Sequence, residues 1–498
     1  MTRSLSALTI HLFVLIFQIT ANAQEPLALN SGSAAQLEAY SKFFEENKAR
    51  HLRQVADLIA IPTLAMVPDH APDLKKAGEY LVNRLNDLGM EKAEYHPADG
   101  FPLVTAEWMH AEGQPTVVFY GHFDVQPADA SRWKSDPFEA DIRDNKMYGR
   151  GATDDKGYII AFLSTIEAMM ELDGGLPVNV KFFLDGSEEF GSQSMQAWLA
   201  EPDNNAWIRQ ADFGFNLDAM MQSDDQGLMW RGLRGGGDVE ITVTSANTAV
   251  HSGIYGGLAP NAIHAAARII ASMYNDDGSV AIEGFSDDLL EVTQELRDEI
   301  ATAEGDMAST LDKEALEVAE WIGEPEFTPL ERTWVRNAMD VTGIRGGYIE
   351  GKASIIAESA WFRVLTRTGP GQDPAKLNDK IMSHVKANTP WGIEVDMVSL
   401  TAGSAPFFPE SDLGFRIGYQ VQTDFFGKEP KVLYVGGGVP ALSYVPDAGG
   451  PPLVPFSFQR SDEGFHADNE YLRIDSFEKG QRAFAHLLHA LVGQPTRD

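Results

Sequence analysis

Strand-like and helix-like segments alternate along the first half of the chain. Residues 117–120 form a short, wholly apolar run, which is typical of a strand buried on both faces of a sheet, and a second strand is expected at 178–184. Helices are expected over three segments: 34–58, 74–88 and 157–172. This alternation predicts an α/β fold with a mixed, mostly parallel sheet that is flanked by helices.

The pattern changes near Gly232. Residues 231–237 are rich in glycine and indicate a flexible junction, after which 238–244 alternate apolar and polar positions like a half-buried antiparallel strand. The elements that follow predict a small split βαβ domain of the α+β class: a helix at 261–274, a strand-like run at 354–365, a helix at 374–387 and a strand at 393–400.

Three further segments complete the predicted organisation. An acidic, helical insertion is expected at about 276–320, and a final helix at 476–491. The domain boundaries are therefore placed as follows: a leader at 1–23, a first domain at 24–231 that resumes at 405–498, and an inserted domain at 232–404.

Composition narrows the classes of partner. A chain of 498 residues with 44% hydrophobic residues is long enough for two or three packed domains. The net charge of −34 argues against DNA, RNA or an anionic membrane surface as a partner. The acidic residues are read either as a solvated surface or as a field that attracts cationic substrates and metal ions.

The first residues have the features of an export signal. Arg3 precedes a mostly apolar stretch at 8–19, and Ala21-Asn22-Ala23 fits a cleavage site before Gln24. A buried N-terminal helix is the alternative. The chain contains no cysteine, which excludes disulfides and a lipid-modified cysteine. We expect a periplasmic or secreted protein, without a later membrane-spanning segment.

Histidine and acidic residues stand where predicted strands end. His122 and Asp124 follow the run at 117–120, Glu188 and Glu189 follow the strand at 178–184, and Asp218 ends the run 213–218. Ligands of open α/β sheets gather outside the carboxyl ends of the strands. Nitrogen and oxygen donors at that edge suit divalent metal ions, so the pattern indicates a metallohydrolase.

The spacing within each motif suggests a division of labour. His122 and Asp124 are two apart and point the same way in an extended chain, so the imidazole can bind metal while the carboxylate holds its other N–H. Asp154 and Asp155 start a helix after a glycine-rich turn, where a carboxylate can bridge two metals or simply cap the helix. Taken alone, the His-x-Asp pair is more typical of a surface than of a metal site.

Glu188 and Glu189 are adjacent and therefore point in different directions. One can bind metal while the other stays free as a general base; a solvated acidic turn is the alternative. His466 follows a glycine loop in the segment 461–470 and is a candidate ligand that is distant in sequence.

Taken together, the motifs resemble the dinuclear zinc metallopeptidase family of carnosinases, aminoacylase-1, succinyl-diaminopimelate desuccinylase and glutamate carboxypeptidase, and most of all its carnosinase-like dipeptidase branch. The matching stretches are 121–127, 133–138, 149–157, 188–192 and 251–257.

This resemblance implies two metal ions, most commonly Zn²⁺, although Mn²⁺ or Co²⁺ also fit. The implied ligands are His122 and Asp218 for one ion, Glu189 and His466 for the other, and Asp154 as a bridge that is followed by a cis peptide.

The resemblance also implies roles around the metals. Asp124 orients His122, and Glu188 is the general base. The inserted domain is a lid that forms a homodimer, so that His251 reaches the partner's active site, and Arg363 binds a substrate carboxylate.

Two stretches depart from the dipeptidase pattern. Residues 434–440 lack the arginine, glutamate and serine of the relatives, and Thr342 and Arg345 replace other residues in the lid. Hydrolysis of an amide bond is therefore indicated more firmly than cleavage of a plain dipeptide. The alternatives are an N-acyl amino acid amidohydrolase and a non-catalytic binding protein on the same fold.

Overall fold

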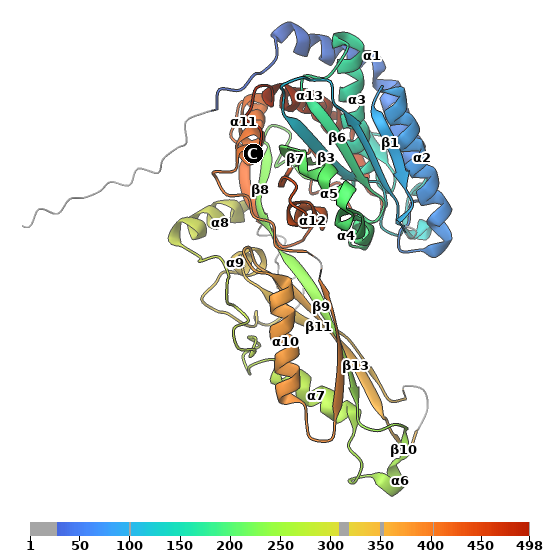
Figure 1. Cartoon of the computed structure of the whole chain (residues 1–498), viewed down its shortest axis with the longest axis vertical. Coiled ribbons are helices and arrows are strands. Elements are labelled where there is room, and N and C mark those ends of the chain that lie inside the picture. The colour runs from blue at the N-terminus through green and yellow to red at the C-terminus, as the bar shows by residue number, and fades with distance from the viewer. Residues whose placement is uncertain (1–26, 99–100, 308–317, 349–352, 402, 498) are drawn as a thin grey trace, which may run out of the picture.

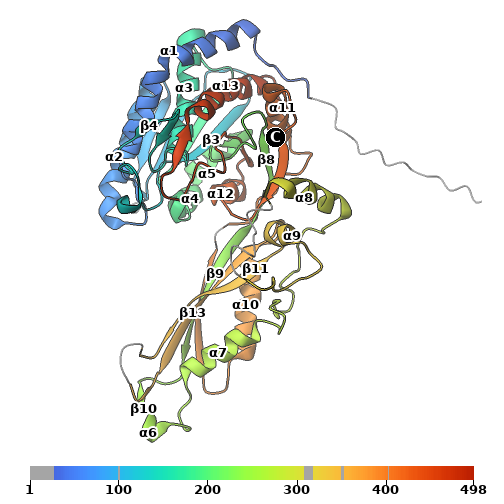
Figure 2. The ribbon, with the colours of Figure 1, turned by 180° about the vertical axis from the view of Figure 1, so that it is seen from behind.

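The computed structural model describes residues 27–98, 101–307, 318–348, 353–401 and 403–497. The predicted leader at 1–23 lies outside them. The described chain has a broad α/β part and a narrow part that projects from it (Figure 1). The view from behind shows the same two parts, joined through β9 and the strands beside it (Figure 2).

The broad part is built on a six-stranded sheet. Its order is β1-β2-β6-β3-β7-β16, in which the last four strands run parallel and β2 is antiparallel to both neighbours. Their bounds are β1 (Glu91–His96), β2 (Leu103–Trp108), β6 (Asn179–Asp185), β3 (Thr116–His122), β7 (Phe213–Asn216) and β16 (Leu453–Pro455). The predicted mixed, mostly parallel sheet is confirmed.

Helices cover both faces of this sheet because successive side chains of its central strands, which point to opposite faces, are mostly apolar. On β6, Phe182 contacts Phe162 of α3 on one face, with ring centroids 5.3 Å apart, while Phe183 contacts Trp198 of α4 on the other at 5.1 Å. The helices around the sheet are α1 (Ala34–Ile59), α2 (Ala71–Asp87), α3 (Lys156–Asp173), α4 (Gln193–Ala200), α5 (Pro202–Arg209), α11 (Leu413–Phe426), α12 (Ala441–Asp447) and α13 (Ile474–Ala490).

A small sheet of β4 (Asp141–Arg143), β5 (Lys146–Tyr148) and β17 (Tyr471–Arg473) joins distant parts of the sequence. Because Tyr471 pairs with Tyr148, the loop before β17 lies against the glycine-rich turn that follows β5. This pairing brings the segment around His466 to the carboxyl edge of the main sheet.

The projecting part, which we call the lid, has its own core. Its antiparallel sheet has the order β11-β13-β9-β14, and helices α7 and α10 pack on one face. Val239 and Ile241 on β9, and Phe362 and Val364 on β13, are fully buried against those helices. The bounds are β9 (Gly235–Thr244), β11 (Ala338–Gly346), β13 (Ser359–Thr368), β14 (Glu394–Thr401), α7 (Ala262–Ser272) and α10 (Pro374–Asn388).

Smaller elements complete the described chain. At the far end of the lid, β10 (Val250–His251) pairs with β12 (Ile355–Ile356), and α6 (Ser252–Tyr255) directly follows β10. At the junction of the two parts, β8 (Leu228–Leu233) pairs in parallel with β15 (Lys431–Val435). The remaining helices are α8 (Gln294–Met307) and α9 (Pro329–Trp334). Among the described helices, none combines the length and the apolar character needed to cross a membrane.

Two expectations about local structure were wrong. Residues 231–237 are not a flexible junction, because all of them except Arg234 belong to β8 or β9 and most are buried. A Cβ on Gly236 would stand 2.6 Å from the carbonyl oxygen of Thr366, so this glycine permits a close approach of strands. In the acidic insertion, 276–293 is not helical; the helix is α8, and 308–317 lies outside the described residues.

Candidate metal centre

The centre lies where three neighbouring parallel strands end. Strand β3 ends at His122, which is paired in register with Asp185 at the end of β6, and Tyr120 is paired with Asn216 at the end of β7. Glu188 and Asp218 follow β6 and β7 within three residues. The strand order β6-β3-β7 therefore brings together side chains that are far apart in the sequence.

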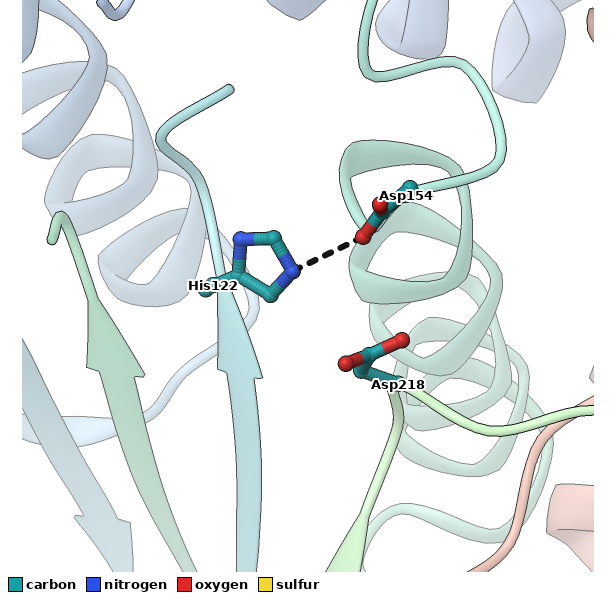
Figure 3. A group of neighbouring side chains, drawn as sticks. All are labelled: His122, Asp154 and Asp218. Carbon is teal, nitrogen blue, oxygen red and sulfur yellow. Dashed lines mark hydrogen bonds and ion pairs between the residues drawn. The ribbon is translucent and has the colours of Figure 1, made fainter. Parts of the chain in front are cut away.

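The first group of candidate ligands comprises His122, Asp154 and Asp218, whose donor atoms lie within 4.8 Å of one another. Figure 3 shows the three side chains converging from β3, the start of α3 and the end of β7. His122 Nε2 lies 3.0 Å from Asp154 Oδ1. His122 is fully buried.

The second group shares Asp154 and adds Glu189 and His466. His466 Nε2 lies 3.1 Å from Asp154 Oδ2 and 3.0 Å from Glu189 Oε2. The two oxygens of Asp154 thus face two different histidines, which is the arrangement expected of a bridging carboxylate. The peptide bond between Asp154 and Asp155 is cis, as the resemblance implied.

Asp124 holds both neighbouring motifs. Its backbone carbonyl lies 3.2 Å from His122 Nδ1, and its Oδ1 lies 3.4 Å from the same nitrogen. Its carboxylate accepts the backbone N–H groups of Glu188, at 3.0 Å, and Glu189, at 3.1 Å. The sequence did not predict these two hydrogen bonds from backbone N–H groups, which fix the short 3₁₀ turn Glu188–Phe190.

Glu188 belongs to neither group of candidate ligands but lies beside both. Burial and the charge of Glu189 raise the pKa of Glu188 well above its ordinary value, against a lowering influence of His122. Burial also opposes ionisation of Asp154, yet hydrogen bonds from His122 and His466 outweigh it and hold the pKa of Asp154 below its ordinary value. Burial thus dominates at Glu188, whereas hydrogen bonds from histidines dominate at Asp154.

Three side chains that support the centre were missed by the sequence reasoning. Gln126 donates to Glu189 Oε2 at 2.7 Å, and Gln459 donates to Asp218 Oδ1 at 3.0 Å. Glu470 is completely buried and accepts the N–H groups of Gly151, Thr153 and Asp154 at 3.1–3.2 Å. Gln126 lies in the stretch 121–127 and Glu470 in the segment 461–470. Their place in these motifs was the sequence signal that could have identified them.

His251 and Arg363 do not join the cluster within the described chain. His251 caps α6 at the far end of the lid, where its Nδ1 accepts the N–H of Gly253 at 2.9 Å (Figure 1). Arg363 lies on the face of β13 opposite the lid helices and donates to Glu240 at 2.8 Å. Their predicted roles toward substrate stay predictions.

The chemistry of the cluster fits divalent cations. Carboxylates outnumber histidines, and Asp155 Oδ1 is buried without a hydrogen-bond partner among the described residues. Bound cations would compensate such an excess of buried carboxylates. Imidazole nitrogens and carboxylate oxygens are the ligands that zinc and related divalent ions prefer. Fold and site together define the class of a metal-dependent α/β hydrolase.

The chain belongs to Peptidase family M20/M25/M40, whose family model matches residues 118–490. It is thus an enzyme of the peptidase class, and the predicted family resemblance is confirmed.

Similar proteins agree with this assignment. The chain is 29% identical to a cysteinylglycine-S-conjugate dipeptidase of Corynebacterium striatum, over 81% of this chain and 87% of the relative. It is 26% identical to the β-Ala-His dipeptidase of Homo sapiens, over 77% of this chain and 76% of the relative. The solved M20 family metallo-carboxypeptidase Sso-CP2 of Sulfolobus solfataricus superposes with a TM-score of 0.76 at 25% identity, covering 89% of this chain and 99% of that one.

Proposed function

We propose that this enzyme is a dinuclear metal-dependent dipeptidase. One observation carries the proposal: two groups of candidate ligands share Asp154, and each oxygen of Asp154 faces one histidine at 3.0–3.1 Å. His122 and Asp218 would hold one ion, and Glu189 and His466 the other. Dipeptides are the proposed substrates because the relatives described above include two dipeptidases.

Bound ions would polarise the scissile carbonyl and lower the pKa of the attacking water. Glu188 is placed to accept the proton of that water, since its carboxylate lies beside both ligand groups and belongs to neither. The same carboxyl group then delivers the proton to the nitrogen of the leaving amine. Asp124 supports this step by fixing the backbone of Glu188.

The substrate class is tested with a panel of dipeptides and N-acyl amino acids, assayed in the presence of Zn²⁺, Mn²⁺ or Co²⁺. We expect dipeptides to be hydrolysed with the higher kcat/KM. Hydrolysis restricted to the N-acyl compounds would instead identify an aminoacylase-type enzyme and reject the dipeptidase proposal.

The role of Glu188 is tested with Glu188→Gln, which keeps the size of the side chain but removes the base. General-base catalysis typically contributes about 10²–10⁴-fold, so kcat is expected to fall by that factor with metal content unchanged. The exposed Glu112→Gln serves as the matched control. A kcat within twofold of wild type would show that Glu188 is not the base.

We also propose that the enzyme acts as a homodimer formed through the lid. His251 lies at the lid's far end, away from its own metal cluster, and apolar side chains are exposed around that end: Ile254 (67%), Leu258 (80%), Ile344 (60%) and Tyr348 (66%). Light scattering should give twice the chain mass, and Leu258→Asp should give the monomer. A monomeric wild type at micromolar concentration would contradict this.

Export is proposed on sequence grounds, from the apolar stretch at 8–19 and the Ala21-Asn22-Ala23 site. N-terminal sequencing of the mature protein from a periplasmic fraction or culture medium should begin at Gln24. Recovery of the chain in the cytoplasm with its first residues intact would reject export.

A further inference from the structure

A cavity of about 350 Å³ lies at the base of the lid, and none of its lining residues belongs to either group of candidate metal ligands. Its wall combines two arginines with apolar side chains: Arg234, Arg332, Phe285, Trp321, Ile322 and Met339. This volume is within the usual range for sites that bind small molecules.

The two arginines are short of negative partners. Arg332, on α9, is half-buried, and its side chain forms neither a hydrogen bond nor an ion pair with the residues that the structure describes. The guanidinium of Arg234 donates one hydrogen bond, from Nε to the carbonyl oxygen of Gly436 at 3.2 Å. Acidic residues outnumber Lys and Arg by 73 to 39 in this chain, so a general lack of carboxylates does not explain the unpaired guanidinium groups.

The acidic residues of the described chain that line the cavity form no ion pair with these two arginines. Glu324 is already bound by Arg336, whose Nε donates to it at 2.9 Å, and Asp340 is an exposed residue of the edge strand β11. Burial lowers the pKa of Arg234 to about 10, and the charge of nearby Arg367 adds to that effect while Asp340 opposes it. An anion bound beside Arg234 would offset the repulsion from Arg367.

The apolar side chains of the wall indicate that the ligand also carries an apolar group. Phe285 and Met339 are buried beneath the cavity, whereas Trp321 and Ile322 remain 36% and 69% exposed. An apolar group that covers Trp321 and Ile322 would gain hydrophobic free energy, which inorganic phosphate or a small polar acid cannot do.

We propose that this cavity binds a small organic carboxylate with an apolar body, whose carboxylate is held by Arg332 and Arg234. The inference is independent of the peptidase reaction, because no metal ligand lines the cavity. Arg234 also connects the cavity to the strip 436–438, since its backbone N–H donates to the carbonyl oxygen of Gly437 at 3.2 Å.

The test is calorimetric titration of the metal-loaded enzyme with phenylacetate. We expect saturable binding that weakens by at least about tenfold in Arg332→Gln, because one charge-assisted hydrogen-bonding partner is lost. Arg268→Gln, an exposed arginine of α7 outside the cavity, should bind like wild type. Ile322→Asp, which places a negative charge at an exposed position of the wall, should also weaken binding.

Two ligand controls separate the features of the site. The neutral 2-phenylethanol should not bind, and inorganic phosphate should bind more weakly than phenylacetate. Equal affinity of wild type and Arg332→Gln for phenylacetate would place the ligand elsewhere, such as at the metals, and overturn the proposal. Binding of 2-phenylethanol as tight as that of phenylacetate would do the same.

Discussion

Glu470 lies beneath the metal cluster and holds the turn that presents Asp154. Its two oxygens accept three backbone N–H groups of residues 151–154 and one hydrogen bond from Arg150 Nη1 at 2.8 Å. Arg150 is itself only 2% exposed, so the two residues form a buried ion pair whose carboxylate accepts four hydrogen bonds.

Glu470→Gln is therefore expected to destabilise the fold. The amide removes the charge that compensates Arg150 and turns an N–H group toward backbone donors. Breaking a buried pair in this way costs about 3–5 kcal/mol, measurable by urea denaturation. The exposed Glu112→Gln should change the free energy of unfolding by less than about 0.5 kcal/mol. A loss below about 1 kcal/mol in Glu470→Gln would contradict the assigned role.

Lys181 on β6 is a second buried charge, with a pH-dependent consequence. Its Nζ donates to the carbonyl oxygen of Trp207 at 2.8 Å and to Gln210 at 2.9 Å. Burial lowers the pKa of Lys181 from 10.5 to about 8, against the raising influence of Glu107. Between these values the unfolded chain holds a proton that the folded chain has released, so the free energy of unfolding rises with pH there.

Lys181→Met should remove this contribution. The difference in free energy of unfolding between wild type and the variant is expected to increase from pH 8 toward pH 10.5, by up to about 1.4 kcal/mol per pH unit. Urea denaturation of both proteins at four pH values measures it. A difference that stays flat or falls would show that Lys181 keeps its ordinary pKa.

The side chains that gather in the two groups of candidate ligands could be picked out from the sequence, because strand ends and local motifs mark them. His122, Glu189 and Asp218 follow apolar strands, and Asp154 starts a helix. Glu470 and Gln459 could not be assigned in the same way. Their partners are backbone N–H groups and carboxylates more than 200 residues away, and no local spacing encodes such contacts.

At the level of elements, the lid shows how alternation decides which face of a strand is buried. Phe362 of β13 is completely buried against the lid helices, while its neighbour Trp361 points to the open face, where Arg345 lies 4.8 Å over its ring. Because adjacent residues of one strand point to opposite faces, substitutions at Phe362 and Trp361 compare the buried face of the lid sheet with its open face.

Phe362→Ala should weaken the lid far more than Trp361→Ala. Removing a buried phenylalanine costs about 3–5 kcal/mol through lost burial and the cavity that remains. Trp361 is half-buried, and loss of its cation–π contact with the exposed Arg345 should cost about 1 kcal/mol or less. Hydrogen exchange of the β9 amides reports local opening of this sheet. Equal protection in both variants would contradict the assigned orientation.

The predicted elements were most accurate where periodicity was strong. The helices expected at 157–172 and 476–491 are α3 and α13, each displaced by at most two residues. Residues 231–237 were misjudged because glycine is typical both of flexible chain and of strands that approach closely. In the segment 276–293, acidic composition was not accompanied by helical spacing, and turns resulted.

For the whole molecule, the sequence indicated an α/β part with an inserted α+β part, and the structure shows two hydrophobic cores that correspond to them. The exact boundaries at 231 and 404 stay predictions. The projection of the lid from the α/β part (Figure 2) could not be foreseen, because no local pattern encodes the path of the chain from β8 into β9.

The central claim is that one chain binds two divalent ions through a shared Asp154. The most direct measurement is metal content per chain by mass spectrometry after dialysis against Zn²⁺, made on wild type, Asp218→Ala and Asp154→Ala. We expect two ions in wild type, one in Asp218→Ala, and the loss of both in Asp154→Ala, with activity lost on chelation and restored by metal. One ion or none in wild type, or full activity of the metal-free enzyme, would contradict the account.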